Sequence, residues 1–313
     1  MNTQVNAVPE SPLGSEAAPA VMSEIRPLYW SIRRELWENR SIYIAPLATA
    51  GVYLFGFLIS LFWVPRSLRG MGAHEPLPPV NVLAMPYSHA AMLIMLIAFL
   101  VGIFYSLDAL HSERRDRSIL FWKSLPVSDL TTVLSKASIP LVVLPLIVFA
   151  ITVALQLVML LLSAAGQLMS RAGSATPWVP PLFEMELVTL YAMAVLVLWH
   201  APIYCWFLLV SGWARRATFL WAVLPPLAVA VLEYVAFRTS YVGSLLHFRL
   251  GGFTAAAFDL KDKNGVPIDA HFIPLAQLAP GRFLTSPGLW IGLVFAAIFL
   301  VAAVRMRRYR DPL

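Results

Sequence analysis

Charged side chains are scarce in this sequence. They make up 13% of its 313 residues, hydrophobic residues make up 59%, and the mean hydropathy is +0.73. Soluble domains carry about 25% charged residues, so this chain has too little polar surface to face water on all sides. The composition excludes an ordinary soluble domain. It predicts an all-α, polytopic integral membrane protein.

Cysteine is almost absent. The single Cys205 lies in an apolar run, which excludes a disulfide framework and a cysteine-based zinc site. Two hydrolase motifs are missing as well. His74 and Glu75 are followed by Pro-Leu-Pro rather than by the second histidine of a His-Glu-x-x-His zinc site, and no Gly-x-Ser-x-Gly occurs. With no close carboxylate pair in the apolar runs either, we expect no catalysis by this chain alone.

A nucleotide-binding loop is also missing. A Walker A loop needs Gly-Lys-Ser/Thr, because its backbone surrounds the phosphates and its lysine neutralises them. The four lysines here follow Trp122, Ser135, Leu260 and Asp262, never a glycine. We therefore expect no cofactor on this chain, and any ATP hydrolysis must come from another protein.

Six apolar stretches are present. A spanning helix needs about 20 mostly apolar residues, and the last of the six stretches is short for one. The predicted spans are Ile42–Val64, His89–Leu110, Ala137–Ser163, Glu186–Val210, Thr218–Phe237 and Leu289–Val304.

Basic residues predict the orientation. Fifteen of the 23 Lys and Arg fall before the first span, between spans two and three, between spans four and five, or after the last. The positive-inside rule makes that side cytoplasmic, with both termini inside. Because membrane topology accounts for the net charge of +6, we expect no nucleic-acid partner.

The spans are flanked by segments of different character. Residues 1–23 are rich in Ala, Ser, Pro and Glu and predict a disordered cytoplasmic tail. Residues 24–41 predict an amphipathic interfacial helix, 42–304 the six-span domain, and 305–313 a basic cytoplasmic tail. In the interfacial helix, one face carries Leu28, Tyr29, Ile32 and Leu36, and we expect this face in lipid. Simple anchoring is an equally acceptable role for it.

The cytoplasmic loop 111–136 is too long for a turn and too mixed to span. It predicts a helix from Glu113 to Lys123, ended by Pro126, followed by Ser128 as the N-cap of the next helix. Apolar residues flanked by charges suggest a docking surface for a soluble partner. A cap on the protein's own bundle is the alternative.

The same loop carries a family resemblance. The loop resembles permease subunits of the type-2 ABC exporter family through its Glu-Arg-Arg-Asp-Arg-Ser, Lys-Ser-Leu-Pro-Val-Ser and Ser-Lys sequences. Arg307–Arg310, at the end of the chain, fit that family as well. The resemblance implies a homodimer in a membrane, such as the bacterial cytoplasmic membrane, with two copies of a separate ATP-binding cassette subunit that carry ATP and Mg. The implied coupling loop docks that ATPase through Glu113, Arg114, Arg115, Asp116, Arg117, Ile119, Leu120, Phe121, Trp122 and Leu125.

Two further features bear on function. The external segment 238–287 is long and aromatic, and in position it resembles the re-entrant helices of that family, although a small cap is possible. Glu233 and His200 are ionisable residues inside predicted spans, so they are candidates for the substrate path or gate. Each has a structural alternative: Glu233 can pair with Arg238, and the His200 ring can bond to a backbone carbonyl freed by Pro202.

Two other functions compete with an exporter subunit for the whole chain. They are a mechanical transmitter coupled to an ATPase and an intramembrane lipid-modifying enzyme.

Overall fold

The computed structural model describes residues 25–68, 80–116, 128–169, 180–260 and 273–309. Within these ranges the chain is all-helical, apart from a single antiparallel bridge between Phe258 and Leu278. Six helical segments are long and apolar enough to cross a membrane, as expected for a multi-pass membrane protein. They are Ser41–Leu61, Ala84–Arg115, Asp129–Gly166, Leu182–Trp213, Thr218–Phe237 and Pro287–Tyr309.

All six predicted spans are therefore confirmed as apolar helices. Thr218–Phe237 agrees at both ends, whereas most of the others extend further than we predicted. The helices continue past the apolar stretches because their backbone hydrogen bonds do not depend on side-chain polarity. The corresponding helices are α2 (Ser41–Leu68), α3 (Val80–Asp108), α6 and α7 (Asp129–Ser138 and Leu144–Met169), α8 (Leu182–Trp213), α9 (Thr218–Phe237) and α13 (Pro287–Tyr309).

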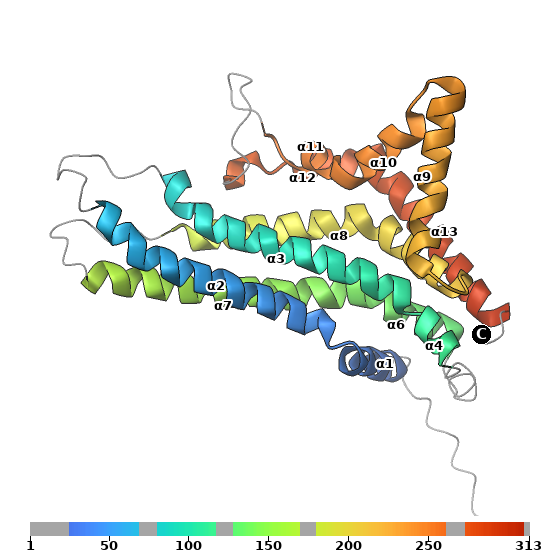
Figure 1. Ribbon diagram of the computed structural model, residues 1–313, viewed down its shortest axis with the longest axis horizontal. Coiled ribbons are helices and arrows are strands. Elements are labelled where there is room, and N and C mark those ends of the chain that lie inside the picture. Colours follow the sequence, from blue (N-terminus) through green and yellow to red (C-terminus); the bar gives the residue numbers. More distant parts are fainter. Residues whose placement is uncertain (1–24, 69–79, 117–127, 170–179, 261–272, 310–313) are drawn as a thin grey trace, which may run out of the picture.

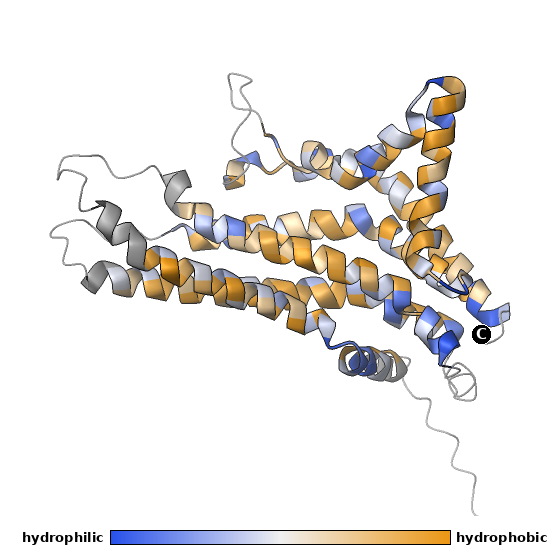
Figure 2. Cartoon of the chain, viewed as in Figure 1, coloured by the Kyte–Doolittle hydropathy of each residue, from blue (hydrophilic) through white to orange (hydrophobic). Residues whose placement is uncertain are grey.

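Four long helices, α2, α3, α7 and α8, run side by side, and α13 packs along α8 (Figure 1). Apolar residues cover these helices along most of their length, and polar residues gather near the end where α4 and α6 lie (Figure 2). The main core joins α2, α3, α7 and α8 through buried side chains such as Ile42, Ile94, Leu144 and Met159. By contrast, α9 departs from the bundle and exposes most of its apolar side chains.

The third span begins with a capped helix and contains an irregular turn. Ser128 is the N-cap of α6, and its Oγ accepts a hydrogen bond from the backbone N–H of Thr131 at 3.0 Å, which confirms the predicted cap. A π-helical turn over Ile139–Val143 separates α6 from α7 and contains Pro140. Since proline lacks a backbone N–H, it disrupts the regular helical hydrogen bonds at this point.

The helix before the first span is present but its orientation corrects our expectation. In Figure 1, α1 (Ile25–Glu38) is seen almost end-on, across the direction of α2. Ile32 and Leu36, which we expected in lipid, pack against the main core instead. The exposed side carries Trp30 and Trp37, with the Arg33 guanidinium near both rings. Part of the predicted lipid face therefore meets protein, next to the buried Glu35, while Tyr29 of that face is exposed.

The connection from α9 to α13 folds back on the bundle. It contains α10 (Tyr241–Gly251), α11 (Phe253–Ala257), a short 3-10 turn and α12 (Pro280–Thr285). These elements contact α8, where Tyr191 donates a hydrogen bond to the carbonyl of Ala257 at 3.0 Å.

The small residues of α13 serve packing within the chain. Phe248 and Trp199 lie against Gly288, and the Arg249 guanidinium lies against Gly292. Ala296, one turn further, packs with buried residues of α8. Small side chains at this spacing let other groups approach the helix backbone closely, so this face of α13 packs within the chain.

Candidate functional site

A buried cluster of charged residues joins four helix ends near the loop that we predicted to couple to an ATPase. Glu35 of α1 is 2% exposed and lies at its centre. Lys136 Nζ of α6 lies 2.8 Å from Glu35 Oε1, and the Tyr105 hydroxyl of α3 donates to Glu35 Oε2 at 2.9 Å. Arg34 lies 3.2 Å from Oε1. The Glu35 carboxylate thus connects α1 to both α3 and α6.

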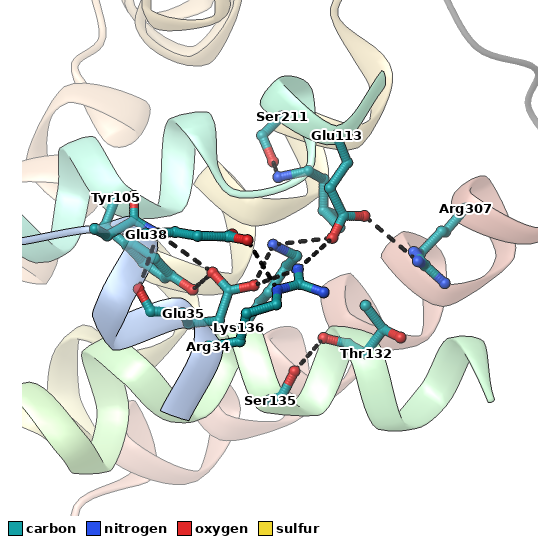
Figure 3. A network of polar contacts seen from close by, with 12 residues as sticks. Arg34, Glu35, Glu38, Tyr105, Glu113, Thr132, Ser135, Lys136, Ser211 and Arg307 are labelled. Atoms are coloured by element: carbon teal, nitrogen blue, oxygen red, sulfur yellow. Dashed lines mark hydrogen bonds and ion pairs between the residues drawn. The ribbon is translucent and has the colours of Figure 1, made fainter. Parts of the chain in front are cut away.

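Glu113 is the second buried carboxylate of the cluster. It belongs to α4 (His111–Arg115), the short helix at the start of the loop. Lys136 Nζ lies 3.2 Å from its Oε1, so one ammonium group pairs with both glutamates. Arg34 and Arg307 each lie 3.4 Å from the same carboxylate. Figure 3 shows Lys136 and Arg34 between the two glutamates, with Arg307 on the other side of Glu113.

Arg307 extends the cluster to the last span. Its guanidinium also pairs with Asp129 in the first turn of α6. Glu38 of α1 pairs with Arg34 Nε at 3.1 Å, near the exposed edge. The buried part of the cluster therefore balances three cations, Arg34, Lys136 and Arg307, with the carboxylates of Glu35, Glu113 and Asp129.

This balance explains how so many charges can be buried. Each ion loses its hydration on burial, and only close partners with good geometry offset that cost. Removing one partner leaves an uncompensated charge, which typically costs about 3–5 kcal/mol. Apart from Glu38, whose partner Arg34 lies on the same helix, each charged member is held by an opposite charge on another helix. The arrangement holds α1, α4, α6 and α13 together as one unit.

The start of the loop is also fixed to the end of α8. The Arg114 guanidinium is buried and donates to the carbonyl of Gly212 at 2.8 Å. The backbone N–H of Leu110 donates to Ser211 Oγ at 3.3 Å, and the His111 ring lies 3.3 Å from the carbonyl of Ala214. The first residues of the predicted coupling loop are therefore attached both to the end of α8 and to the ion cluster.

The predicted docking residues divide into three groups. We expected Glu113 and Arg114 in a charged rim, but both are buried inside the protein, since each has polar partners on neighbouring helices. Arg115 and Asp116 are exposed and pair with each other at 3.1 Å. The remaining predicted docking residues lie outside the described part of the chain; they are Arg117, Ile119, Leu120, Phe121, Trp122 and Leu125.

Glu233 has a clear local role. Its carboxylate accepts hydrogen bonds from the backbone N–H groups of Tyr241 and Val242, both at 2.7 Å, and from the Thr239 hydroxyl at 2.9 Å. The carboxylate thus caps the N-terminus of α10 and fixes the turn after α9. The guanidinium of Arg238 lies over the Tyr234 ring, 5.9 Å from its centroid.

His200 connects α8 to α10. Its Nδ1 lies 2.8 Å from the carbonyl of Leu196, and its Nε2 lies 3.3 Å from the carbonyl of Leu250. We expected the ring to bond a carbonyl freed by Pro202, which is that of Leu198. The ring instead reaches the carbonyl one turn before its own position and a second carbonyl from α10.

Sequence reasoning missed the central role of Glu35. It lies seven positions after Leu28 and three after Ile32, so it shares their face of α1, and this spacing could have identified it. Lys136 and Arg307 entered the sequence analysis as topological charges and as parts of the family resemblance, not as partners of carboxylates. Nothing in a single sequence pairs them with carboxylates from distant segments.

Comparison of the chain with known proteins identifies no relatives. No family model, no curated protein and no solved structure matches the chain. Among the described residues, no group of three or more His, Cys, Asp or Glu is placed to hold a metal ion.

Proposed function

We propose that this chain is the transmembrane permease subunit of an ATP-driven exporter of the type-2 ABC class. One observation carries the proposal: the ion cluster connects the start of the predicted coupling loop to three helices, α1, α6 and α13. A force applied to such a loop would move α1, the third span and the last span together. A permease that takes its energy from a separate ATPase needs a connection of this kind.

The proposed topology places the ion cluster, both termini and the loop 111–136 in the cytoplasm. The basic residues at this end support that orientation, because positive charge is retained on the cytoplasmic side. Segment 238–287 is then external, and its α10 to α12 form the proposed re-entrant element. A bacterial cytoplasmic membrane is the proposed location.

A homodimer is part of the proposal. A cavity among α3, α7 and α8, lined by Phe99, Leu144 and Tyr204, has a volume of about 30 Å³. Such a volume holds about one water molecule and is too small for a cargo molecule. A second, more open apolar hollow of about 400 Å³ lies between α2 and α7 and is lined by residues such as Leu54 and Ile151. The homodimer rests on the family resemblance, and in it the proposed path lies between the two copies, each with its own ATP-binding subunit.

The test uses the permease co-expressed with an ATP-binding cassette protein encoded beside it. Arg115→Glu with Arg117→Glu should weaken copurification of the ATPase, because these charges belong to the proposed contact. Arg308→Gln, which lies outside the loop, is the matched control. Wild-type copurification and ATP turnover after both reversals would contradict the coupling role. Size-exclusion of the permease alone checks that the variants fold.

The mechanical transmitter remains the second candidate. The observation that favours it is α9, which stands away from the bundle and leads into the long folded segment α10–α12 (Figure 1). A permease that moves an external partner needs an extended element of this kind. Vesicle transport assays would separate the two functions, because a transmitter hydrolyses ATP without moving a solute.

A further inference from the structure

Arg249 of α10 is a partly buried cation without a carboxylate partner among the described residues. Its Nη1 donates to the carbonyl of Gly288 at 2.9 Å, and its guanidinium carbon lies 5.0 Å from the centroid of the Trp199 ring. Its Nε and Nη2 are buried and have no hydrogen-bond acceptor in the described part of the chain. Unlike the cations of the ion cluster, this one is not neutralised by any residue within the ranges that the structure describes.

The backbone around Arg249 is fixed firmly enough to keep the guanidinium in place. Trp199 donates its indole N–H to the carbonyl of Arg249 at 2.9 Å, and His200 reaches the carbonyl of Leu250. The guanidinium lies against Gly292, where a methyl group would overlap Nη2. The position thus needs glycine on α13 and an indole on α8.

Arg249 lies at the depth of the apolar spans. Trp199 is fourteen positions before Trp213, the last residue of α8, which corresponds to about 21 Å of helix. The apolar layer of a bilayer is about 30 Å thick, so the guanidinium contacts α8 well inside that thickness. The guanidinium stays charged at neutral pH, because arginine is not deprotonated in proteins. An unneutralised cation at this depth is costly, and such residues commonly mark a ligand site.

The surface beside Arg249 is apolar. Phe248, Leu245 and Leu250 of α10 are all largely exposed, and the Phe248 ring lies 5.2 Å from that of Trp199. Nε and Nη2 have no acceptor in the described part of the chain, but neighbouring groups cover both atoms, so an acidic head group would have to displace part of this packing to reach them. The cation and the exposed aromatic and aliphatic side chains beside it together complement a molecule with an acidic head and an apolar body. The guanidinium fork in particular suits two oxygens of a phosphate or carboxylate.

We propose that Arg249 and the adjacent face of α10 bind the acidic head group, phosphate or carboxylate, of an amphiphile. The amphiphile is either the cargo or an acidic membrane lipid, and both offer the same chemistry. Only its assignment as cargo rests on the proposed function. Binding itself requires neither an ATPase nor transport.

The test is a titration of the purified chain, in a non-ionic detergent, with dodecyl phosphate. Arg249→Gln should raise the dissociation constant at least tenfold, because it removes the cation. Arg249→Lys should give an intermediate value, since lysine keeps the charge but loses the planar fork. Gly292→Ala should weaken binding with every charge retained. Arg238→Gln, an exposed arginine at the other end of α10, is the matched control and should bind as the wild type does.

Further ligands define the chemistry. Inorganic phosphate and dodecylphosphocholine should both bind much more weakly than dodecyl phosphate, because one lacks the apolar body and the other lacks the net charge. In nanodiscs, competition by phosphatidylglycerol identifies a membrane lipid as the natural source, and failure to compete identifies the cargo.

Unchanged affinity in folded Arg249→Gln, or an equal loss in Arg238→Gln, would overturn the proposal. Size-exclusion profiles and thermal unfolding midpoints establish which variants fold. Where the glutamine variant does not fold, the lysine variant carries the test, and wild-type affinity there overturns the role of the guanidinium. Because the titrations contain no ATPase, a failure of the exporter assignment leaves them unaffected.

Discussion

Lys136 Nζ lies 2.8 Å from Glu35 Oε1, although 101 positions separate the two residues in the sequence. Both side chains are almost completely buried. Lys136 also reaches Glu113, so a single ammonium group holds two carboxylates from two other helices. This relationship makes the ends of α1, α4 and α6 depend on one another.

Lys136→Met should destabilise the protein by about 3–5 kcal/mol, because Glu35 and Glu113 would stay buried after losing their shared cation. Thermal unfolding in detergent measures the effect. Arg115→Gln is the control, because its pair with Asp116 is exposed and contributes little to stability. A Lys136→Met variant as stable as this control would mean that the pairs contribute little.

Combining Lys136→Met with Glu35→Gln should cost less than the sum of the two single substitutions. The second substitution removes one of the charges that the first leaves unpaired, and residues in direct contact are not additive. A double-variant cycle on the same unfolding midpoints provides the measurement. Strict additivity would show that the two side chains do not interact.

Arg307→Gln should loosen the C-terminal end of α13. The guanidinium pairs with Glu113 and Asp129, whereas its neighbour Arg308 is exposed, so Arg308→Gln provides a control on the same helix turn. Amide hydrogen exchange should become faster in the last turns of α13 and in α4 for Arg307→Gln alone. Equal exchange in both variants would contradict the connection.

Glu233→Gln should weaken the turn between α9 and α10. The amide has one acceptor oxygen instead of two and no charge for the helix N-terminus, so part of the cap is lost. Trypsin should then cleave after Arg238 several times faster than in the wild type. Glu184→Gln, which changes an exposed glutamate of α8, is the control.

In an assembled complex, Glu233→Gln should lower the substrate-stimulated ATPase activity more than the basal ATPase activity. Equal loss of both activities would remove Glu233 from the transport path.

The proposed topology predicts that Leu120→Cys is labelled only from the cytoplasm and Lys263→Cys from outside. The background is Cys205→Ser, because Cys205 is the sole native cysteine and is buried. An impermeant thiol reagent on intact cells, compared with permeabilised cells, makes the distinction. Labelling at position 120 from outside, or none at 263, would reverse or refute the topology.

Local patterns determined much of this fold. The six apolar stretches predict the six long helices, because a helix in lipid needs only apolar side chains and its own backbone hydrogen bonds. Ser128 was predictable as an N-cap for a similar reason: its Oγ bonds within its own turn. The small residues at every fourth position of α13, Gly288, Gly292 and Ala296, likewise indicate that other groups pack closely against this helix.

Tertiary structure alone decided the sites. Part of the face of the interfacial helix that we expected in lipid packs against protein, while Tyr29 of that face stays exposed. The cations that neutralise Glu35 come from Arg34 beside it and from Lys136, far along the chain. The position of Arg249 against Trp199 and Gly292 likewise depends on how α10 folds back on α8 and α13. Hydropathy and helical spacing are properties of neighbouring residues, so the sequence could specify the helices. Which charge meets which depends on contacts between distant segments, and only the packed bundle brings those together.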